Sequence, residues 1–209
     1  MKLMKKKKLH EEEIEVDENA LAKLVDTADE DLLKAGGVYY ITGSIEEDSL
    51  KAIHQNVLLK HLAGPKLWKQ DLTFVVNSTG GSIDETNGLL DLLANIRMDI
   101  RTVGLGTCAS AGAMLVCAGT KGKRTVGPNT ILMVHCYSWG SWGKHHELVS
   151  ARHVQNAIYE QELAFWIKHS KYTKKVDVEK YLLRKEDTWL TAKEAMKHGI
   201  VDHIGDVIR

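Results

Sequence analysis

The sequence predicts an α/β domain built from repeated β-α units around a largely parallel sheet. Two observations predict this class. Short runs rich in β-forming residues alternate with helical runs from Gly36 onward, and strands that alternate with helices pair mostly in parallel. One helical run, from about Lys144 to Ser170, is much longer than the others. We therefore expect one α/β domain that carries a single long helix.

The first half of this domain holds three strand and helix pairs. The run 38–42 is rich in β-branched and aromatic residues and ends at Gly43, and apolar residues at helical spacing follow it. One side of that first helical run carries Leu50, Ile53, Val57, Leu58 and His61. The expected strands are 38–42, 72–77 and 100–105, and the expected helices are 45–62, 82–96 and 109–118.

The second half of the domain is less regular. Short strands are expected around the turn at Pro128-Asn129, and the basic stretch from Lys121 to Arg124 is interpreted as a solvated turn. The remaining expected elements are strands at 123–126 and 130–134, the long helix, ordered segments at 177–183 and 191–198, and a last strand near Val201.

Composition limits the classes of function. The chain has 209 residues, 44% of them hydrophobic and 27% charged, which fits one globular domain. Its formal net charge is zero, which argues against binding of nucleic acid through bulk charge. The three cysteines follow no CxxC spacing, so we interpret them as reduced thiols and expect neither disulfides nor a metal site. No run is long and apolar enough to predict a membrane span.

Residues 1–34 differ from the rest of the chain. Four lysines at 5–8 precede three glutamates at 11–13, with no glycine or proline in the whole stretch. No apolar segment follows the basic start, so it does not predict a secretory signal. A solvated and partly disordered arm, a mobile gate and a removable pro-segment all remain open. We expect a domain boundary here, with an arm at 1–34 and one domain at 35–209.

A serine among small residues is the strongest functional signal. Ser110 lies in Gly106-Thr107-Cys108-Ala109-Ser110-Ala111-Gly112-Ala113, directly after an apolar run, which is typical of a strand that turns sharply into a helix. Such a turn holds the hydroxyl at the positive end of the helix. His135 ends the apolar run 131–134, and Asp187 follows later. The order Ser, His, Asp differs from that of chymotrypsin, subtilisin and the α/β-hydrolases, which indicates another fold with the same chemistry.

Each of these residues also has a plainer interpretation. Ser110 alone could be a small residue at a helix entry, His135 a structural histidine, and Asp187 a turn residue. Other carboxylates lie close enough in sequence to take the place of Asp187, namely Asp177, Glu179 and Glu186. A Cys-His dyad is a further alternative. We prefer to interpret its candidates, Cys108 and Cys136, as small apolar fillers.

Taken together, the motifs resemble those of the ClpP family of self-compartmentalised serine peptidases. The resemblance covers roughly residues 37–206. It rests on Asn77-Ser78-Thr79-Gly80-Gly81-Ser82, the segment around Ser110, Lys121-Gly122-Lys123-Arg124, Pro128-Asn129, Met133-Val134-His135, Asp187-Thr188-Trp189-Leu190-Thr191-Ala192 and Gly199-Ile200-Val201-Asp202.

The resemblance implies a role for each motif. Ser110 would be the nucleophile, His135 the base, and Asp187 the group that orients the imidazole. The backbone N–H groups of Gly81 and Ala111 would form the oxyanion hole. An extended substrate would lie between two strand-like segments. These substrate-binding residues would be Ser82 and Ile83 on one side and Ser138, Trp139 and Gly140 on the other.

The resemblance also implies a fold and partners. The fold would be of the ClpP/crotonase type, with the long helix as a protruding handle that docks two heptameric rings into a tetradecamer. The partner would be an AAA+ unfoldase that uses ATP, while this chain would need no cofactor. Its substrates would be polypeptides in the cytoplasm, with no nucleic acid or membrane involved.

Four departures from the family pattern are visible. Thr79 replaces the usual proline before the two glycines, and Ala111 replaces a common methionine after the nucleophile, so the preferred size of the apolar substrate side chain is open. Glu186 stands where an arginine commonly helps to lock two rings. The cleft that usually receives the unfoldase loops with aromatic residues would be lined by Thr73, Val75 and Asn95. We therefore expect non-standard docking of the unfoldase.

The sequence predicts a serine endopeptidase that works through an acyl-enzyme inside a ring-shaped chamber. The alternative within the same fold is a virus-type protease that matures capsid or scaffold proteins without an unfoldase. A non-catalytic ring subunit and an acyl-CoA enzyme of the crotonase type fit less well, because all three triad candidates are present and neither class needs them.

Overall fold

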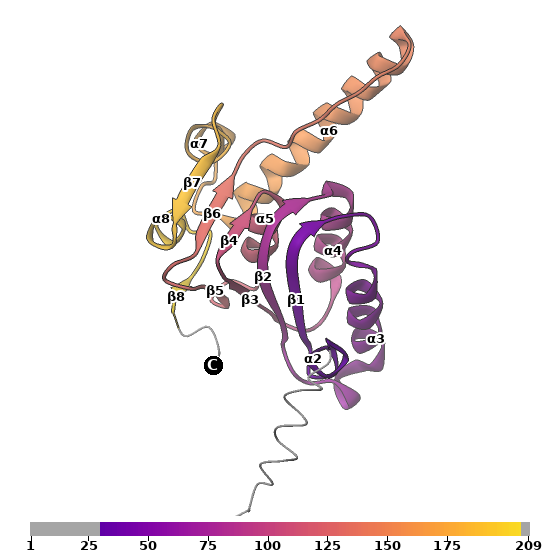
Figure 1. Cartoon of the computed structure of the whole chain (residues 1–209), viewed down its shortest axis with the longest axis vertical. Helices are drawn as coiled ribbons and strands as arrows, with labels where there is room; N and C mark the ends of the chain where they lie inside the picture. The colour runs from indigo at the N-terminus through magenta and orange to yellow at the C-terminus, as the bar shows by residue number, and fades with distance from the viewer. Residues whose placement is uncertain (1–29, 206–209) are drawn as a thin grey trace, which may run out of the picture.

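The computed structural model describes residues 30–205. In chain order (Figure 1) the elements are α2 (Glu30–Ala35), β1 (Val38–Ile45), α3 (Lys51–Leu67), β2 (Leu72–Gly81), α4 (Ile83–Asn95), β3 (Ile100–Gly104), β4 (Thr107–Ala109), α5 (Ala111–Cys117), β5 (Arg124–Val126), β6 (Ile131–Val134), α6 (His145–His169), α7 (Lys175–Tyr181), β7 (Thr188–Thr191), α8 (Ala192–Lys197) and β8 (His203–Ile204).

The larger sheet is parallel throughout. Its five strands follow the order β1-β2-β3-β5-β8, and each step is bridged by a helix or a longer crossover, as parallel pairing requires. Strand β2 pairs with β3 only from Leu72 to Val76, so its last five residues extend beyond β3. That extension ends at the glycine pair Gly80-Gly81 and reaches the neighbourhood of β4.

The smaller sheet has the order β4-β6-β7. Strands β4 and β6 are parallel, whereas β6 and β7 are antiparallel, with Val134 opposite Thr188. This register decides where two functional candidates lie, because His135 follows β6 and Asp187 precedes β7. The antiparallel pairing therefore brings residues that are 52 positions apart in the chain to one end of the small sheet.

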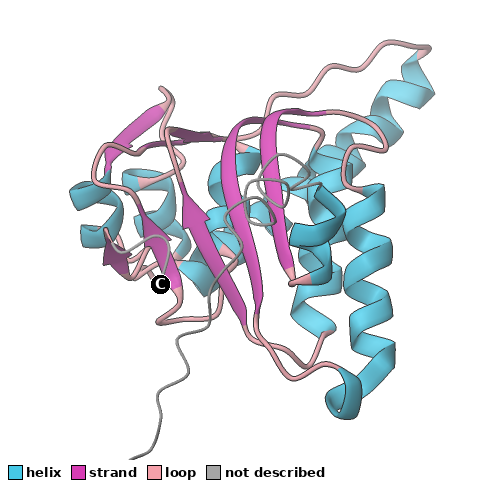
Figure 2. Cartoon of the chain, turned by 60° about the horizontal axis from the view of Figure 1, so that its bottom comes forward, coloured by secondary structure: helices cyan, strands magenta, loops and turns pink. Residues whose placement is uncertain are grey.

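Helix α5 connects the two sheets at the centre of the molecule. All seven of its residues are buried, and small side chains at its start allow close approach of β2. Helices α3 and α4 cover one face of the larger sheet (Figure 2). The largest fully buried side chains include Trp166, Tyr39 and Phe74, and Tyr39 stacks on Phe74 with ring centroids 4.9 Å apart. The site described below therefore lies on a well-packed core.

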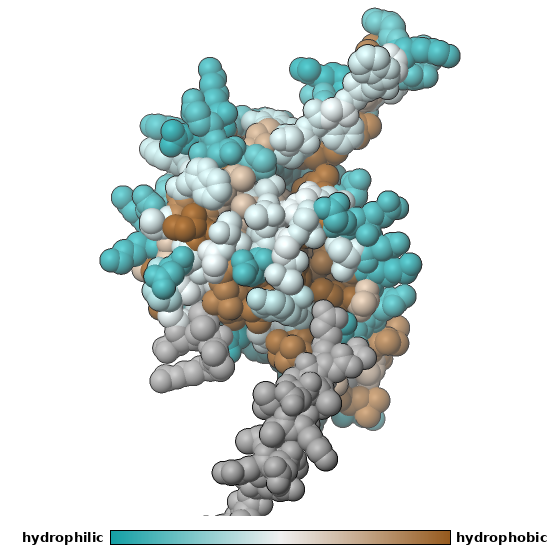
Figure 3. Space-filling view, viewed as in Figure 1, coloured by the Kyte–Doolittle hydropathy of each residue, from teal (hydrophilic) through white to brown (hydrophobic). Residues whose placement is uncertain are grey.

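Helix α6 projects away from this body (Figure 1), as the ClpP-type fold predicts. Its 25 residues span about 37 Å at 1.5 Å per residue, and only Glu162, Leu163 and Trp166 near its C-terminal end are buried. Hydrophilic side chains gather at the far end of the projection (Figure 3). The N-terminal part of α6 and the segment that precedes it thus leave the compact domain, while the C-terminal part of α6 packs on it.

Most predicted elements are confirmed within two or three residues, but β2 extends to Gly81 and the sequence predicts neither β4 nor β7. The first long helix also differs from the prediction. The first long helix begins at Lys51 rather than at residue 45, because residues 46–50 form a turn in which Asp48 has a φ of +62°. It also continues past residue 62, where a kink at Gly64 (φ +74°) precedes Pro65. Leu58 is 44% exposed, so it does not lie on the buried side with Leu50, Ile53 and Val57.

The predicted domain boundary falls at the edge of the described residues. Most of the predicted arm, residues 1–29, lies outside them, and α2 occupies the arm's last positions and Ala35. The division into an arm at 1–34 and a domain at 35–209 stays a prediction. In the described part of the chain, no helix is both long and apolar enough to cross a membrane.

Candidate active site

Ser110 occupies the sharp turn that the sequence predicts between a strand and a helix. It follows β4 directly and is the N-cap of α5, with φ +54° and ψ −122°. Asp48 and Ser110 are the two non-glycine residues with positive φ in residues 30–205. A strained backbone of this kind persists where the surroundings over-determine it, and functional sites are common among such places. The backbone N–H of Ser110 donates to the Met133 carbonyl at 2.8 Å, which ties the turn to β6.

Glycines allow the end of β2 to pack closely against this turn. A Cβ on Gly80 would lie 2.7 Å from the Ala109 oxygen and 2.9 Å from the Ala111 nitrogen. A Cβ on Gly112 would lie 2.4 Å from the Ser78 oxygen. Real Cβ atoms do not approach backbone so closely, so no larger residue fits without movement of the chain. One contact between β2 and the start of α5 therefore explains the small residues in the motif at 77–82 and in the motif at 106–113.

The serine and the histidine contact each other directly. His135 follows β6 immediately, and its Nε2 lies 2.8 Å from Ser110 Oγ. In the arrangement that uses this contact, the serine hydroxyl donates to Nε2 and the ring carries its proton on Nδ1. A general base must be within hydrogen-bond reach of the proton that it takes, and this pair satisfies that condition.

Asp187 lies on the other side of the histidine, as the β6-β7 register requires. Its Oδ1 is 3.5 Å from His135 Nδ1, longer than a good hydrogen bond. The side chain of Asp187 is 53% exposed, whereas that of His135 is 22% exposed. The neighbouring alternative, Glu186, is 76% exposed at its side chain and lies 3.8 Å from Arg184. The structure thus brings Ser110, His135 and Asp187 together in the order that the triad hypothesis needs.

The two predicted oxyanion-hole donors lie on opposite sides of the serine turn. Ala111 is the first residue of α5, where backbone N–H groups have no partner within the helix. Gly81 ends β2, and the next residue, Ser82, donates its N–H to the Ile45 oxygen of β1 at 2.6 Å. Because successive N–H groups of a strand point to opposite edges, the Gly81 N–H is expected to point away from β1. The oxyanion roles of Gly81 and Ala111 stay predictions that this placement favours.

The predicted substrate-binding residues fall into two segments. Ser82 caps α4, and its Oγ accepts the N–H of Glu85 at 3.3 Å; Ile83 begins that helix. Ser138, Trp139 and Gly140 lie in the irregular segment between β6 and α6, where Trp139 is 41% exposed. The Tyr137 and Trp139 rings meet edge to face with centroids 6.4 Å apart. Ile83 and Tyr137 line the same cavity, which brings the two segments to one place.

The thiols of Cys108 and Cys136 lie in surroundings that raise their pKa values. The Cys108 thiol is buried and lies 3.2 Å from the Val76 oxygen, and burial raises its pKa to about 12. Burial and the nearby Glu162 carboxyl also raise the pKa of Cys136. A thiol must ionise to act as a nucleophile, so these environments disfavour a Cys-His dyad. The geometry favours the serine instead.

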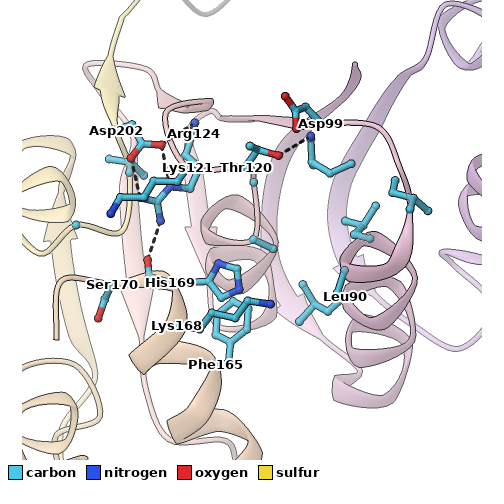
Figure 4. Close-up of a pocket in the computed structure, with 18 of the residues that line it drawn as sticks. Leu90, Asp99, Thr120, Lys121, Arg124, Phe165, Lys168, His169, Ser170 and Asp202 are labelled. Atoms are coloured by element: carbon cyan, nitrogen blue, oxygen red, sulfur yellow. Dashed lines mark hydrogen bonds and ion pairs between the residues drawn. The ribbon is translucent and has the colours of Figure 1, made fainter. Parts of the chain in front are cut away.

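Sequence reasoning missed a buried ion pair. The sequence predicts a solvated turn over 121–124, but Arg124 is 4% exposed. Its Nε and Nη2 donate to Asp202 at 2.9 and 2.7 Å, and its Nη1 donates to the His169 oxygen at 2.7 Å (Figure 4). These contacts join β5 to the end of α6 beside a cleft of about 820 Å³, away from Ser110. No sequence spacing indicates a pair 78 positions apart.

Sequence reasoning also missed Glu162. This carboxylic acid is 7% exposed, and the N–H of Tyr137, two residues after His135, donates to it at 3.4 Å. Burial raises its pKa to about 7, although Tyr137, Trp166 and Cys136 act in the opposite direction. Its only sequence signal is an acid at helical spacing from the apolar Trp166. Among residues 30–205, no cluster of His, Cys, Asp and Glu could hold a metal ion.

Known proteins with similar sequences are proteases. The family model described as Clp protease matches residues 22–207. The chain is 36% identical over 138 residues to ATP-dependent Clp protease proteolytic subunit 2 of Thermobifida fusca, a match that covers 65% of this chain and 66% of that protein. It is 31% identical over 173 residues to proteolytic subunit 1 of Corynebacterium diphtheriae, covering 81% and 78%. It is 32% identical over 168 residues to proteolytic subunit 1 of Frankia casuarinae, covering 78% and 74%.

Proposed function

The chain belongs to the Clp protease family, and from this premise we propose that it is a ClpP-type serine endopeptidase, the proteolytic subunit of an ATP-dependent Clp protease. The observation that carries the proposal is the 2.8 Å contact between Ser110 Oγ and His135 Nε2 at the strained turn. The names of the relatives support the same activity.

The proposed reaction proceeds through an acyl-enzyme. Ser110 Oγ attacks the carbonyl carbon of the scissile peptide while His135 Nε2 takes the hydroxyl proton. The developing oxyanion receives hydrogen bonds from the N–H groups of Gly81 and Ala111, each of which typically contributes a hundred- to a thousandfold in rate. The C–N bond then breaks and the proton on His135 passes to the leaving amine. Water, activated by the same imidazole, hydrolyses the ester and restores Ser110.

Asp187 orients the imidazole in this scheme. A carboxylate beside Nδ1 holds the proton there and leaves Nε2 free to act as the base, and it stabilises the imidazolium that forms. The distance of 3.5 Å between Asp187 Oδ1 and His135 Nδ1 is compatible with this role after a small movement, and catalytic hydrogen bonds are often long before substrate binds.

The substrate would bind as an extended strand. The end of β2 extends beyond β3, and Gly81 at its end, with Ser82 and Ile83 directly after it, would form one side of this site. The irregular segment Ser138, Trp139 and Gly140 would form the opposite side. Main-chain hydrogen bonds on both sides would position the scissile bond without selecting a sequence, and a side-chain pocket would provide the selection.

The chain would act as part of an assembly. Members of this family form oligomeric rings that pair with Clp ATPases. We propose heptameric rings that associate into a double ring through the projecting α6, and an AAA+ unfoldase that consumes the ATP. Thr73 and Val75 lie on the partly exposed face of β2 and Asn95 ends α4, so none of these three positions of the predicted unfoldase cleft carries an aromatic anchor. A cytoplasmic location stays a prediction.

The direct test is Ser110→Ala. We expect hydrolysis of a fluorogenic apolar peptide to fall by at least about 10⁴-fold, because removal of the nucleophile leaves no acyl-enzyme route. A serine-directed fluorophosphonate should label the wild-type protein at Ser110 and leave the variant unlabelled. Native mass spectrometry of both proteins provides the control, since the assembly should be the same. Turnover by the variant at a tenth of the wild-type rate or more would rule out Ser110 as the nucleophile.

A further inference from the structure

A small cavity lies next to the proposed catalytic groups. It has a volume of about 330 Å³ and is bounded by α4, α5, the segment after His135, and α6. Three of its lining residues follow closely on catalytic positions. Ile83 is two residues after Gly81, Met114 is one helical turn after Ser110, and Tyr137 is two residues after His135. These three residues place the cavity close to the proposed catalytic groups.

Most of the cavity wall is apolar, but two carboxylic acids belong to it, the exposed Asp91 and the buried Glu162, and so does Lys168. Apolar side chains from α4, α5 and α6 form the wall, among them Ile83, Leu90, Met114, Ile158 and Phe165. Four residues line both this cavity and the larger cleft, namely Leu90, Asp91, Phe165 and Lys168. Figure 4 shows Leu90, Phe165 and Lys168 in the wall of the larger cleft. Glu162 also lines the wall, and glutamate is almost never so deeply buried without a charged partner.

In residues 30–205, no cationic group acts on the pKa of Glu162, although Lys168 belongs to the same cavity wall. Within the described residues, the groups that act on its pKa are the Tyr137 N–H, Trp166 and Cys136, and no basic residue is among them. Burial raises the pKa of this carboxyl to about 7, so that its neutral and ionised forms are both populated near neutral pH. The Tyr137 N–H, the Trp166 side chain and the Cys136 thiol all lie close enough to the carboxyl to act on it as hydrogen-bond donors, and none of them carries a positive charge. In the described part of the chain, the carboxyl therefore has neutral polar neighbours but no cation among the groups that act on it.

We propose that Glu162 determines specificity, and that this cavity accepts a lysine or arginine side chain from the residue before the scissile bond of a polypeptide substrate. The inference rests on the proposed function, because it needs Ser110 as the nucleophile. The long methylene stem of such a side chain covers the apolar wall, while its cationic end reaches the carboxylate. An incoming cation favours the ionised form of Glu162 and forms a charge-assisted hydrogen bond with it. A purely apolar preference, as the sequence resemblance suggests, leaves the carboxyl unpaired.

The test compares peptides that differ only at the residue before the scissile bond. Fluorogenic peptides with lysine, arginine, norleucine or leucine at that position share length and all other residues, and kcat/KM is measured for each. We expect the wild-type protein to cleave the lysine peptide at least about tenfold better than the norleucine peptide, which has the same stem without the charge. A wild-type preference for norleucine or leucine over lysine would overturn the proposal.

Glu162→Gln separates a role in specificity from a structural one. Glutamine keeps the size and an oxygen that can accept the Tyr137 N–H, but it loses the charge. We expect the ratio of kcat/KM for lysine over norleucine to fall by at least about tenfold, with little change for the norleucine peptide. Glu160→Gln is the matched control, because Glu160 is an exposed carboxylate of the same helix that pairs with Lys175, and its removal should leave the ratio unchanged. An equal loss for all peptides in Glu162→Gln would show a structural role and contradict the proposal.

Labelling of Ser110 by the fluorophosphonate distinguishes the two possible failures. If the protein is labelled and cleaves apolar peptides best, the proposed function is supported and the inference about Glu162 is contradicted. If the protein is neither labelled nor active on any of the peptides, both the proposed function and the inference that rests on it are contradicted.

Discussion

Ser110 lies at a turn whose neighbours are buried and in backbone contact, whereas Asp187 precedes a short strand and has half of its side chain in solvent. The contact from serine to histidine measures 2.8 Å, and that from aspartate to histidine measures 3.5 Å. At the serine end of the triad, meaning Ser110 and the segments packed against its turn, close backbone contacts at glycines and the buried core determine where the side chain lies. At the aspartate end, a four-residue antiparallel pairing does so.

This difference indicates which changes each end can tolerate. An added methyl group at the serine end meets backbone atoms that have no room to move. A changed side chain at the aspartate end meets mainly solvent, so its effect should appear in the reaction and not in folding. We therefore expect substitutions at the serine end to lower stability and those at the aspartate end to lower the rate alone.

The largest effect at the aspartate end is expected for Asp187→Asn. The amide can no longer accept the Nδ1 proton as a charged group, so His135 is less well held in the tautomer that makes Nε2 a base. We expect kcat for a fluorogenic peptide to fall by about 10²- to 10⁴-fold, with the melting temperature unchanged. The peptidase assay and differential scanning fluorimetry measure both.

Glu186→Gln serves as the matched control for that substitution. Glu186 is more exposed and makes a long contact with Arg184 of the kind that contributes little at a surface, so we expect the rate to stay within about threefold. A near-normal rate for Asp187→Asn together with a large loss for Glu186→Gln would move the third catalytic role to Glu186.

An intermediate effect is expected for Gly112→Ala at the serine end. The new Cβ would lie 2.4 Å from the Ser78 oxygen, so β2 and α5 must separate. We expect the free energy of unfolding to fall by about 3 kcal/mol, as for overpacked cores, and denaturant titration measures it. Gly140→Ala is the control, because no atom lies within 4 Å of its Cβ position, and its stability should stay within about 0.5 kcal/mol. Equal stabilities of the two variants would show that the serine end is not tightly packed.

The smallest of these effects is the contribution of Glu162 to the pH dependence of the protein's stability. Its pKa is raised to about 7 in the folded protein, above the value near 4.3 of an unfolded chain. The stabilisation that this carboxyl contributes is therefore fully present below about pH 4, and it is lost as the pH rises through about 7. Other titratable groups near it are Cys136, Tyr137, Tyr159, Asp91 and Lys168.

We expect the wild-type protein to lose on the order of 2 kcal/mol relative to Glu162→Gln between pH 5 and pH 8. Urea titrations at both pH values measure the difference, and Glu160→Gln corrects for general effects of charge. A difference between wild type and Glu162→Gln that does not change with pH would show that the carboxyl titrates at an ordinary pKa.

The sequence by itself determined the fold class, most of the elements and the serine turn. The strand-to-helix motif around Ser110 is local, because its small residues and its conformation lie within eight consecutive positions. The long helix could be predicted for the same reason, since helical spacing is a property of one segment. The three triad candidates were found because each stands at the end of an apolar run or beside a recognisable motif.

Only the tertiary structure decided the contacts between distant segments. The register of β6 against β7 places Asp187 beside His135, and nothing within the local sequence sets that register. Burial of Arg124 against Asp202, and of Glu162 against the segment that follows His135, depends on which elements pack together. A charged residue has the same local sequence signal whether it is solvated or buried. Its environment, and therefore its chemistry, is created only when segments far apart in the chain exclude water from it.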